Sequence, residues 1–311
     1  MQPLVTICIP NYNKSAYVER TLGSIFSQTY KNIELIIIDD CSADASEKVI
    51  RKALERSPFP SVFLKNEVNN GVAFTAQKGV DAAKGKYFQV LSSDDIILPH
   101  KIEHQVKLME QAEADTAFIY SNLKVIDEDD HLIDKNYFSD IGFKGTELPS
   151  GNIYSVLLAL NFVPALTTLI RLSHLREIGG YDTNLKSEDW DIFLQLSKKY
   201  KVLSTDEVTA HYRVERNSLM HGSSNKAAVY SSFCRTLMKH AGQSKDFDKS
   251  IYRNIQEFAA IVYCFGGSES GYWLKKSLRH SFSVKNLIYF LANAAGIKYA
   301  AYRKIKSAGG Q

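Results

Sequence analysis

The sequence predicts an α/β fold, a mostly parallel sheet flanked by helices and followed by a helical C-terminal region. Three observations lead to this prediction. Runs such as residues 4–9 and 33–38 are largely apolar and β-branched along their whole length, which is typical of strands buried on both faces of a parallel sheet. Between these runs, apolar residues recur at helical spacing. Each run ends abruptly at polar residues, as parallel strands do where their loops begin.

The elements follow from this pattern in chain order. The first strand stops at Pro10, and Ser15 is the expected N-cap of the helix after it. The second strand stops at Asp39 and Asp40. The predicted strands are residues 4–9, 33–38, 62–64 and 87–91, and the predicted helices are about 15–28, 45–56 and 72–83. Strands alternating with helices in this way favour β-α-β units.

Two adjacent carboxylates, Asp94 and Asp95, follow the last of these strands. Such a pair is costly unless a cation lies nearby, because like charges a few Å apart repel and lose solvation. Oxygen ligands without thiols favour magnesium or manganese, and these ions usually accompany a phosphate. The pair therefore indicates a metal–diphosphate site, and a solvated Asp-Asp turn is the alternative.

Three polar clusters follow predicted parallel strands: residues 10–12, 39–40 and 94–95. In open α/β sheets, ligands bind beyond the carboxyl ends of the strands. These clusters are far apart in sequence, but the topology brings them to one edge of the sheet. The pattern therefore predicts a nucleotide-binding α/β domain.

Several motifs, in order, resemble the family 2 glycosyltransferases over about the first two-thirds of the chain. They are Ile9-Pro10-Asn11-Tyr12-Asn13-Lys14, residues 24–30, residues 34–42, Asn70-Gly71-Val72-Ala73, residues 83–87, and Ser93-Asp94-Asp95 followed by Pro99. The resemblance implies a GT-A fold, which is a Rossmann-like sheet that binds a nucleotide-diphospho-sugar and a divalent metal, manganese or magnesium. It also implies inverting sugar transfer, with a UDP-sugar favoured as the donor.

The resemblance assigns donor-side roles to residues at the sheet edge. Asp40, or less readily Asp39, would accept a hydrogen bond from the base. Asp94 would contact the ribose or the metal, and Asp95 would be the main metal ligand. The remaining expected contacts to the nucleotide-sugar come from Pro10, Tyr12, Asn13, Gly71 and Ser93. The alternatives are helix-capping acids at residues 39–40 and an ordinary strand-ending turn at residues 10–12.

On the acceptor side, the segment 186–194 resembles the family's Glu-Asp motif, with Asp189 as the base and Glu188 as a supporting or acceptor-binding residue. An alternative is an N-cap at Ser187 followed by favourable first-turn acids. Further along, Arg213 would contact the diphosphate, and neutral His211 would complete the metal shell or serve a structural role.

Two departures from the family pattern are informative. Ser92 stands where relatives often carry a further acid, which leaves fewer candidate ligands. The Gln-x-x-Arg-Trp motif of processive synthases is absent from the sequence, which favours transfer of a single sugar. The expected acceptor is a glycan or a lipid-linked oligosaccharide in surface polysaccharide synthesis. A polyprenyl-phosphate glycosyltransferase and a non-catalytic nucleotide-sugar-binding module are the alternatives.

Length and composition agree with one large catalytic domain and an appendage. The 311 residues are 45% hydrophobic, and the formal net charge is +4. We expect a GT-A domain over residues 1–222, with a nucleotide-sugar half at 1–99 and an acceptor half at 100–222, and a helical region over 223–311. Four cysteines without metal-ligand spacing, and a strand that begins at residue 4 with no room for a signal peptide, favour a cytoplasmic location.

The C-terminal region combines basic and aromatic residues, and no acid follows Glu269. Helices of this kind bind at the interface of an anionic membrane, so we expect a peripheral position on the cytoplasmic face. Packing on the catalytic domain or on a second copy in a homodimer is the alternative. A nucleic-acid partner is disfavoured because the net charge is modest and no recognition motif is present.

Two surface segments are also predicted. The acidic run 127–130 is typical of a solvated hairpin turn. Residues 214–224 read as a loop that closes over the donor.

Overall fold

The fold is described from a computed structural model that covers residues 2–214 and 225–300. The chain divides into two compact units. Of the described residues, 2–184 and 191–214 form the first, and 185–190 and 225–300 form the second. The predicted domain boundary at residue 222 and most of the predicted closing loop lie outside the described residues.

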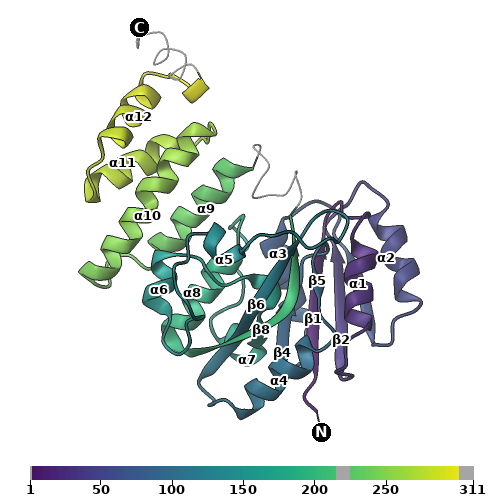
Figure 1. Ribbon diagram of the computed structural model, residues 1–311. Helices are drawn as coiled ribbons and strands as arrows, with labels where there is room; N and C mark the ends of the chain where they lie inside the picture. Colours follow the sequence, from purple (N-terminus) through teal and green to yellow (C-terminus); the bar gives the residue numbers. More distant parts are fainter. Residues whose placement is uncertain (1, 215–224, 301–311) are drawn as a thin grey trace. The chain divides into compact units, whose positions relative to one another are not determined.

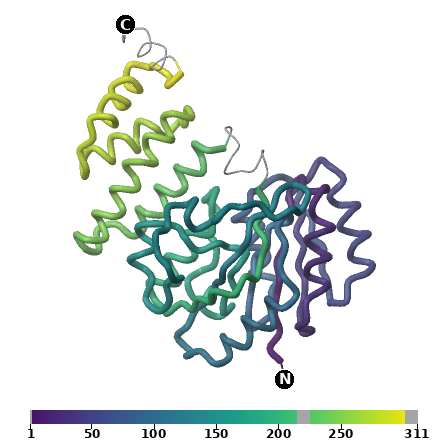
Figure 2. The backbone as a smooth tube through the Cα atoms, in the orientation of Figure 1, coloured from purple at the N-terminus to yellow at the C-terminus, as the bar shows by residue number. Residues whose placement is uncertain are grey.

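The first unit is built on one mixed sheet of eight strands among the described residues (Figure 1). Across the sheet their order is β3-β2-β1-β4-β7-β6-β8-β5. The strands are β1 (Val5–Asn11), β2 (Ile33–Asp39), β3 (Ser61–Lys65), β4 (Tyr87–Val90), β5 (Ile96–Ile97), β6 (Thr116–Ile126), β7 (Leu169–Arg171) and β8 (Lys201–Arg213). The tube in Figure 2 leads from the N-terminus into β1, at the centre of the parallel part.

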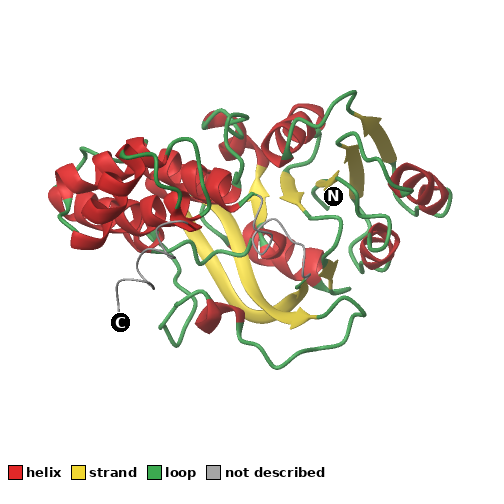
Figure 3. Cartoon of the chain, turned by 90° about the horizontal axis from the view of Figure 1, so that it is seen from above, coloured by secondary structure: helices red, strands yellow, loops and turns green. Residues whose placement is uncertain are grey.

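The sheet is parallel where the sequence predicts a nucleotide-binding half. Strand β1 pairs in parallel with β2 and β4, and β2 pairs in parallel with β3. Beyond β4 the pairing becomes mixed, since β7 is antiparallel to both β4 and β6, and β5 is antiparallel to β8. The sheet is curled and flanked by helices (Figure 3), so the predicted α/β class is confirmed.

Helices connect the strands of the first unit. They are α1 (Val18–Phe26), α2 (Ser46–Leu54), α3 (Val72–Ala82), α4 (Lys101–Gln111), α5 (Tyr137–Asp140), α6 (Tyr154–Ala159), the 3₁₀ turn η1 (Ala165–Thr167), α7 (Leu172–Glu177) and α8 (Asp189–Lys199). The predicted N-cap at Ser15 is wrong, because α1 begins at Val18 after a backbone turn in which Tyr17 occupies the cap position without a side-chain hydrogen bond.

The core of the first unit contains a buried cation, Lys101, whose residue surface is fully covered. Its ammonium donates to the side-chain oxygens of Gln89 (3.0 Å) and Gln105 (2.6 Å) and to the carbonyl of Thr168 (3.2 Å). These three acceptors match the three donors of an ammonium. The network therefore joins α4 to β4 and to the segment just before β7.

The second unit consists of helices over its described part: α9 (Lys226–Met238), α10 (Lys245–Cys264), α11 (Ser270–His280) and α12 (Val284–Ala294). Successive helices reverse direction in the tube of Figure 2. The predicted helical character from about residue 227 agrees with these elements. Within the described ranges, no helix is both long and apolar enough to cross a bilayer.

Trp190 anchors the segment 185–190 within this helical unit. Its buried indole packs edge-on against Phe233 (ring centroids 5.4 Å apart) and against Phe258 (6.1 Å). The backbone N–H of Lys186 donates to the Ser232 hydroxyl at 2.8 Å. The acidic pair Glu188–Asp189 is therefore carried on a segment that α9 and α10 hold.

Candidate active site

At the carboxyl end of β2, the Asp39 carboxylate organises the loops after β1 and β2. It is buried and accepts from the Asn11 amide at 2.7 Å, and from the Ser42 hydroxyl and backbone N–H at 2.6 and 3.0 Å. The Ser42 hydroxyl in turn accepts from the backbone N–H of Asn13 at 2.9 Å. Asn13 has a positive φ of 52°, a conformation that Asn tolerates better than most residues. The exposed ring of Tyr12 precedes it.

The neighbouring Asp40 anchors the loop before α3. Its carboxylate accepts from the Asn66 amide (2.8 Å) and from the backbone N–H groups of Asn70 (3.0 Å) and Gly71 (2.7 Å). Gly71 caps α3 with φ 90°, a region open mainly to glycine. Both acids thus bind protein groups, and their predicted contact with a base stays a prediction.

The predicted metal pair lies beyond β4. Asp95 is buried, and its Oδ1 accepts from the backbone N–H of Arg213 at 2.9 Å. Asp94 Oδ2 lies 2.6 Å from the ammonium of Lys14. Burial raises the pKa of the Asp95 carboxyl well above its ordinary value, and the adjacent Asp94 adds to the rise. A buried acid beside a second acid is the environment in which a bound cation is most favourable.

Arg213 holds this pair from both its backbone and its side chain. The side chain has no exposed surface. Its Nε donates to the Asp94 carbonyl and its Nη1 to the Asp127 carbonyl, both at 2.7 Å, and its Nη2 donates to the Asp130 carboxylate. The guanidinium also lies 4.9 Å from the ring centroid of Tyr17. The contact of Arg213 with a diphosphate, expected from the sequence, stays a prediction.

The candidate metal ligands at this edge, which are oxygen and imidazole nitrogen atoms, fit a hard divalent cation. Among the described residues, the second oxygen of the Asp95 carboxylate accepts no hydrogen bond, and Ser93 is buried beside the pair. Burial and Lys124 lower the pKa of His211, which favours the neutral imidazole that ligates metals. Within residues 2–214 and 225–300, no three His, Cys, Asp or Glu side chains are already arranged as a cage. Joint ligation by Asp94, Asp95 and His211 therefore stays a prediction.

The predicted acceptor-side pair lies in the segment 185–190, which belongs to the second unit and contains the first residues of α8. Asp189 begins α8, and its Oδ1 accepts from the backbone N–H of Trp190 at 2.6 Å and from the Ser187 hydroxyl at 3.3 Å. Burial, followed by the charge of Asp189, raises the pKa of the partly exposed Glu188 to about 8. Glu188 therefore keeps its proton near neutral pH, which limits the like-charge repulsion within the pair.

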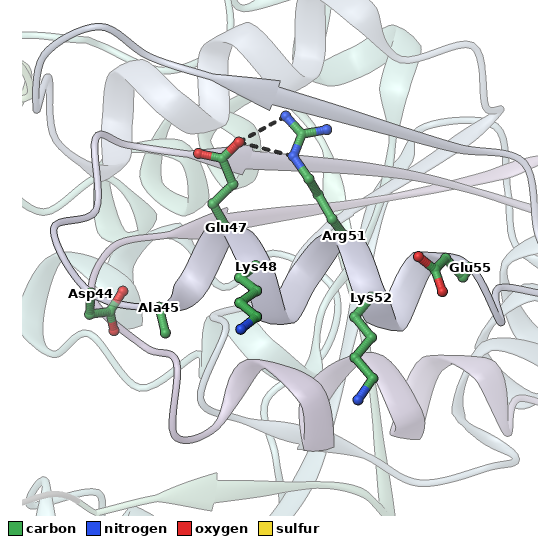
Figure 4. Close-up of a pocket in the computed structure, with 7 residues that line it drawn as sticks. All are labelled: Asp44, Ala45, Glu47, Lys48, Arg51, Lys52 and Glu55. Carbon is green, nitrogen blue, oxygen red and sulfur yellow. Dashed lines mark hydrogen bonds and ion pairs between the residues drawn. The ribbon is translucent and has the colours of Figure 1, made fainter.

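A separate hollow lies along the outer face of α2 (Figure 4). Two of its charged lining residues pair with each other, since Arg51 donates to Glu47 at 2.9 Å; Lys65, which is not part of the lining, lies 2.6 Å from the same carboxylate. None of the predicted site residues lines this hollow. We assign it no functional role.

Several residues of the site were not expected from the sequence. Asp130, placed in a solvated turn by the sequence, instead binds two arginines, Arg213 and Arg20. Its side chain keeps 33% of its surface exposed, so Asp130 lies in a turn at the surface as predicted, but its charge is paired. These partners lie 83 and 110 residues away along the chain, and no local pattern carries such a signal. Asn66 and Lys14 were missed for the same reason.

The fold and the acids at the carboxyl edge define a GT-A protein. Two solved structures show this fold at low sequence identity. The mannosyltransferase PcManGT from Pyrobaculum calidifontis, in complex with GDP-Man and Mn²⁺, matches with a TM-score of 0.62 at 14% identity, covering 99% of this chain and 84% of that one. Residues 1–349 of S. aureus TarS, in complex with UDP-GlcNAc, match with a TM-score of 0.60 at 14% identity, over 97% and 92%.

Sequence comparison gives the family. The pattern described as Glycosyl transferase family 2 matches residues 6–153. An uncharacterized glycosyltransferase of Rickettsia typhi is 30% identical over 304 residues, which is 93% of this chain and 91% of that protein. TuaG of Bacillus subtilis, whose name assigns it to teichuronic acid biosynthesis, is 30% identical over 72% of this chain and 83% of its own length. The chain belongs to glycosyl transferase family 2.

Proposed function

We propose that this glycosyltransferase moves one hexose from a nucleotide-diphospho-sugar to a hydroxyl of a glycan or lipid-linked acceptor, with inversion at the anomeric carbon. The observation that carries the proposal is the Asp95 carboxylate, which is buried at the carboxyl edge of the sheet beside Asp94 and has an oxygen open to a ligand. An acid in this setting is stabilised by a cation, and a cation here accompanies a diphosphate.

The donor half of the proposal rests on the edge of β1 and β2. The Oδ1 atom of Asn11 is buried there without a hydrogen-bond partner among the described residues, and a donor group on a bound base would satisfy it. The solved structures with the same fold carry UDP-GlcNAc or GDP-Man, which supports a nucleotide-sugar. We favour a UDP-sugar, with Tyr12 and Pro10 under the nucleoside.

Divalent metal is part of the proposal. Asp95 would be the main ligand, with Asp94 and neutral His211 as further ligands, and the Mn²⁺ bound to PcManGT supports the use of such an ion. When bound, a divalent cation neutralises the charge that develops on the leaving nucleoside diphosphate. The protein residues hold the donor, orient its anomeric carbon and accept the proton from the acceptor.

Asp189 is the proposed base. It removes the proton from the acceptor hydroxyl as that oxygen bonds to the anomeric carbon and the bond from carbon to the phosphate oxygen breaks. Because attack comes from the face opposite the leaving group, the configuration inverts. The N–H of Trp190 at 2.6 Å fixes one oxygen of the carboxylate, and a protonated Glu188 spares the base a second adjacent charge.

The proposed setting is surface polysaccharide synthesis. TuaG is similar to this chain over 83% of its own length, and its name assigns it to teichuronic acid biosynthesis. A lipid-linked acceptor would place the reaction at the cytoplasmic face of a membrane. On α12 the exposed residues Val284, Ile288 and Leu291 form one apolar line, and Lys285 adds positive charge on the same helix. We therefore include binding of α12 to an anionic bilayer.

Donor binding tests this function. Calorimetry with UDP-, dTDP- and GDP-sugars, each with Mn²⁺ and with a chelator, should show metal-dependent binding of one nucleotide class. Asp95→Asn should remove that metal dependence, whereas Asp129→Asn, an exposed acid of the 127–131 turn, should retain it. A folded protein that binds no member of the panel would contradict the proposed function.

The base has its own test. Asp189→Asn should lower kcat by about 10²- to 10⁴-fold while the Kd for the donor stays unchanged, because a base acts in the transition state. Asp246→Asn, which changes an exposed acid in the first turn of α10, is the control and should leave kcat unchanged. Equal turnover in both variants would exclude Asp189 as the base.

A further inference from the structure

Asp130 supplies the negative charge for a buried arginine that itself holds the metal pair. Arg213 is a cation with no exposed side-chain surface, and its Nη2 donates to Asp130 Oδ1. Among the described residues, the other side-chain hydrogen bonds of this guanidinium end on neutral carbonyls, those of Asp94 and Asp127. A buried cation needs a counter-charge. Removing that counter-charge destabilises the protein by more than the ion pair contributes in net terms, because the cation is left buried and unpaired.

The turn that carries Asp130 is tied to two other elements of the first unit. The second carboxylate oxygen of Asp130 accepts from Arg20 on α1 at 2.7 Å, and Arg20 also donates to the Glu128 carbonyl at 3.3 Å. Both guanidinium groups lie near the ring of Tyr17, at 5.3 and 4.9 Å from its centroid. Asp130 thus joins α1 to the end of β8, both of which belong to the first unit.

Arg213, which Asp130 holds, is itself hydrogen-bonded to the acidic pair Asp94 and Asp95. Its backbone N–H binds Asp95 Oδ1 at 2.9 Å, and its Nε binds the Asp94 carbonyl at 2.7 Å. If Asp130 were neutral, the guanidinium, whose Nε already binds the Asp94 carbonyl, would be drawn towards the carboxylates of the adjacent acidic pair. A guanidinium on those oxygens would compete with a divalent cation for them.

We propose that Asp130 is a positioning residue for the metal site: by pairing with Arg213, it keeps the guanidinium off the Asp94 and Asp95 carboxylates and leaves them available to a divalent cation. This role rests on the proposed function, since it presupposes that the pair binds metal. It explains why an acid in a surface turn is paired with two cations from distant parts of the chain.

Asp130→Asn isolates the charge from the geometry. Asp130 has φ 72°, and Asn adopts the left-handed region as readily as Asp does, so the turn should persist. The amide oxygen can still accept a hydrogen bond, but the counter-charge is gone. Asp129→Asn is the matched control, because Asp129 is the exposed neighbour in the same turn.

The protein is titrated with Mn²⁺, and free Mn²⁺ is measured by its electron paramagnetic resonance signal. The titration contains the nucleoside diphosphate of the class that binds in the calorimetry with UDP-, dTDP- and GDP-sugars. Asp130→Asn should raise the Kd for Mn²⁺ roughly tenfold, while Asp129→Asn matches wild type. Nucleotide affinity measured in chelator should be equal in all three proteins. This last readout separates positioning from general loss of structure, which would weaken both kinds of binding.

Three results would overturn the role. In the first, Asp130→Asn binds Mn²⁺ as tightly as wild type does. In the second, it loses nucleotide binding in chelator together with Mn²⁺ binding. In the third, Asp129→Asn and Asp130→Asn raise the Kd for Mn²⁺ by the same factor. If Asp130→Asn does not fold, Arg20→Gln decides, because it loosens Asp130 without touching Arg213: a Kd raised about threefold supports the role, and an unchanged Kd overturns it. A wild-type protein without metal-dependent nucleotide binding would instead overturn the proposed function, and this role with it.

Discussion

At the scale of single residues, Lys101 shows how a charge is accommodated inside the first unit. Burial lowers the pKa of its ammonium well below the ordinary value, yet three acceptors surround it, from Gln89, Gln105 and Thr168. Gln105 also donates to the Thr167 carbonyl at 2.6 Å, and Gln89 to that of Leu166 at 3.0 Å. The segment before β7 is therefore held by a polar network with Lys101 at its centre.

Replacing Lys101 by methionine should destabilise the protein by about 2–4 kcal/mol, because it leaves three buried acceptors without a donor. Urea unfolding followed by circular dichroism measures the change. Lys107→Met, at an exposed position of the same helix, should stay within about 0.5 kcal/mol of wild type. If both variants unfold at the same urea concentration, the network contributes nothing to stability.

At the scale of elements, the segment leading into α8 contains Glu188, a carboxylic acid that stays protonated near neutral pH. Burial and the neighbouring Asp189 raise the pKa of Glu188 to about 8, above its value of 4.5 in the unfolded chain. Between these two values the folded state binds a proton that the unfolded state has released. Stability from Glu188 is therefore fully present below pH 4.5, and it falls as the pH rises towards 8.

Glu188→Gln should flatten this dependence. Between pH 5 and pH 8, wild type should lose about 1–2 kcal/mol more stability than the variant, a fraction of the full linkage value because the side chain is partly exposed. Denaturant unfolding at several pH values measures the difference. Glu257→Gln, an exposed position on α10, should keep the wild-type slope, and parallel slopes for wild type and Glu188→Gln would contradict the raised pKa.

At the scale of the whole molecule, charge is unevenly distributed along the chain. The formal net charge is only +4, yet residues 270–311 contain no acid. Within the described part of that stretch, α12 carries the exposed line of Val284, Ile288 and Leu291. The asymmetry gives the C-terminal helices a charge different from that of the first unit, which suits the proposed anionic bilayer.

Changing these three residues to serine should weaken binding to vesicles of phosphatidylcholine and phosphatidylglycerol about tenfold or more, because apolar burial and charge act together. Co-sedimentation measures binding, which should decrease with added salt and be absent from pure phosphatidylcholine. Serine at Val62 and Val68, exposed in the first unit, is the control. A variant that binds vesicles normally but changes from dimer to monomer would assign the line to a homodimer contact.

Prediction from the sequence succeeds where the signal is local. The first two strands read directly as buried runs. Strand β1 begins one residue later than predicted and continues two residues further, through Pro10, and β2 continues one residue further. Ser15 shows a local failure, because a backbone turn rather than a hydroxyl precedes α1. Asp130 shows a failure of another kind: its acidic neighbourhood indicates solvent, but its partners come from α1 and β8.

The sequence by itself determined the α/β class, the glycosyltransferase family and the acids at the strand ends. Apolar periodicity and short motifs depend only on residues that are close together in the chain. Only the tertiary structure decided what each acid binds. Asp40 anchors the loop before α3, Asp95 is held by the backbone of Arg213, and Asp130 is held by two arginines. Hydrogen bonds and ion pairs depend on distances of about 3 Å between atoms, and such distances across the chain exist only once it has folded.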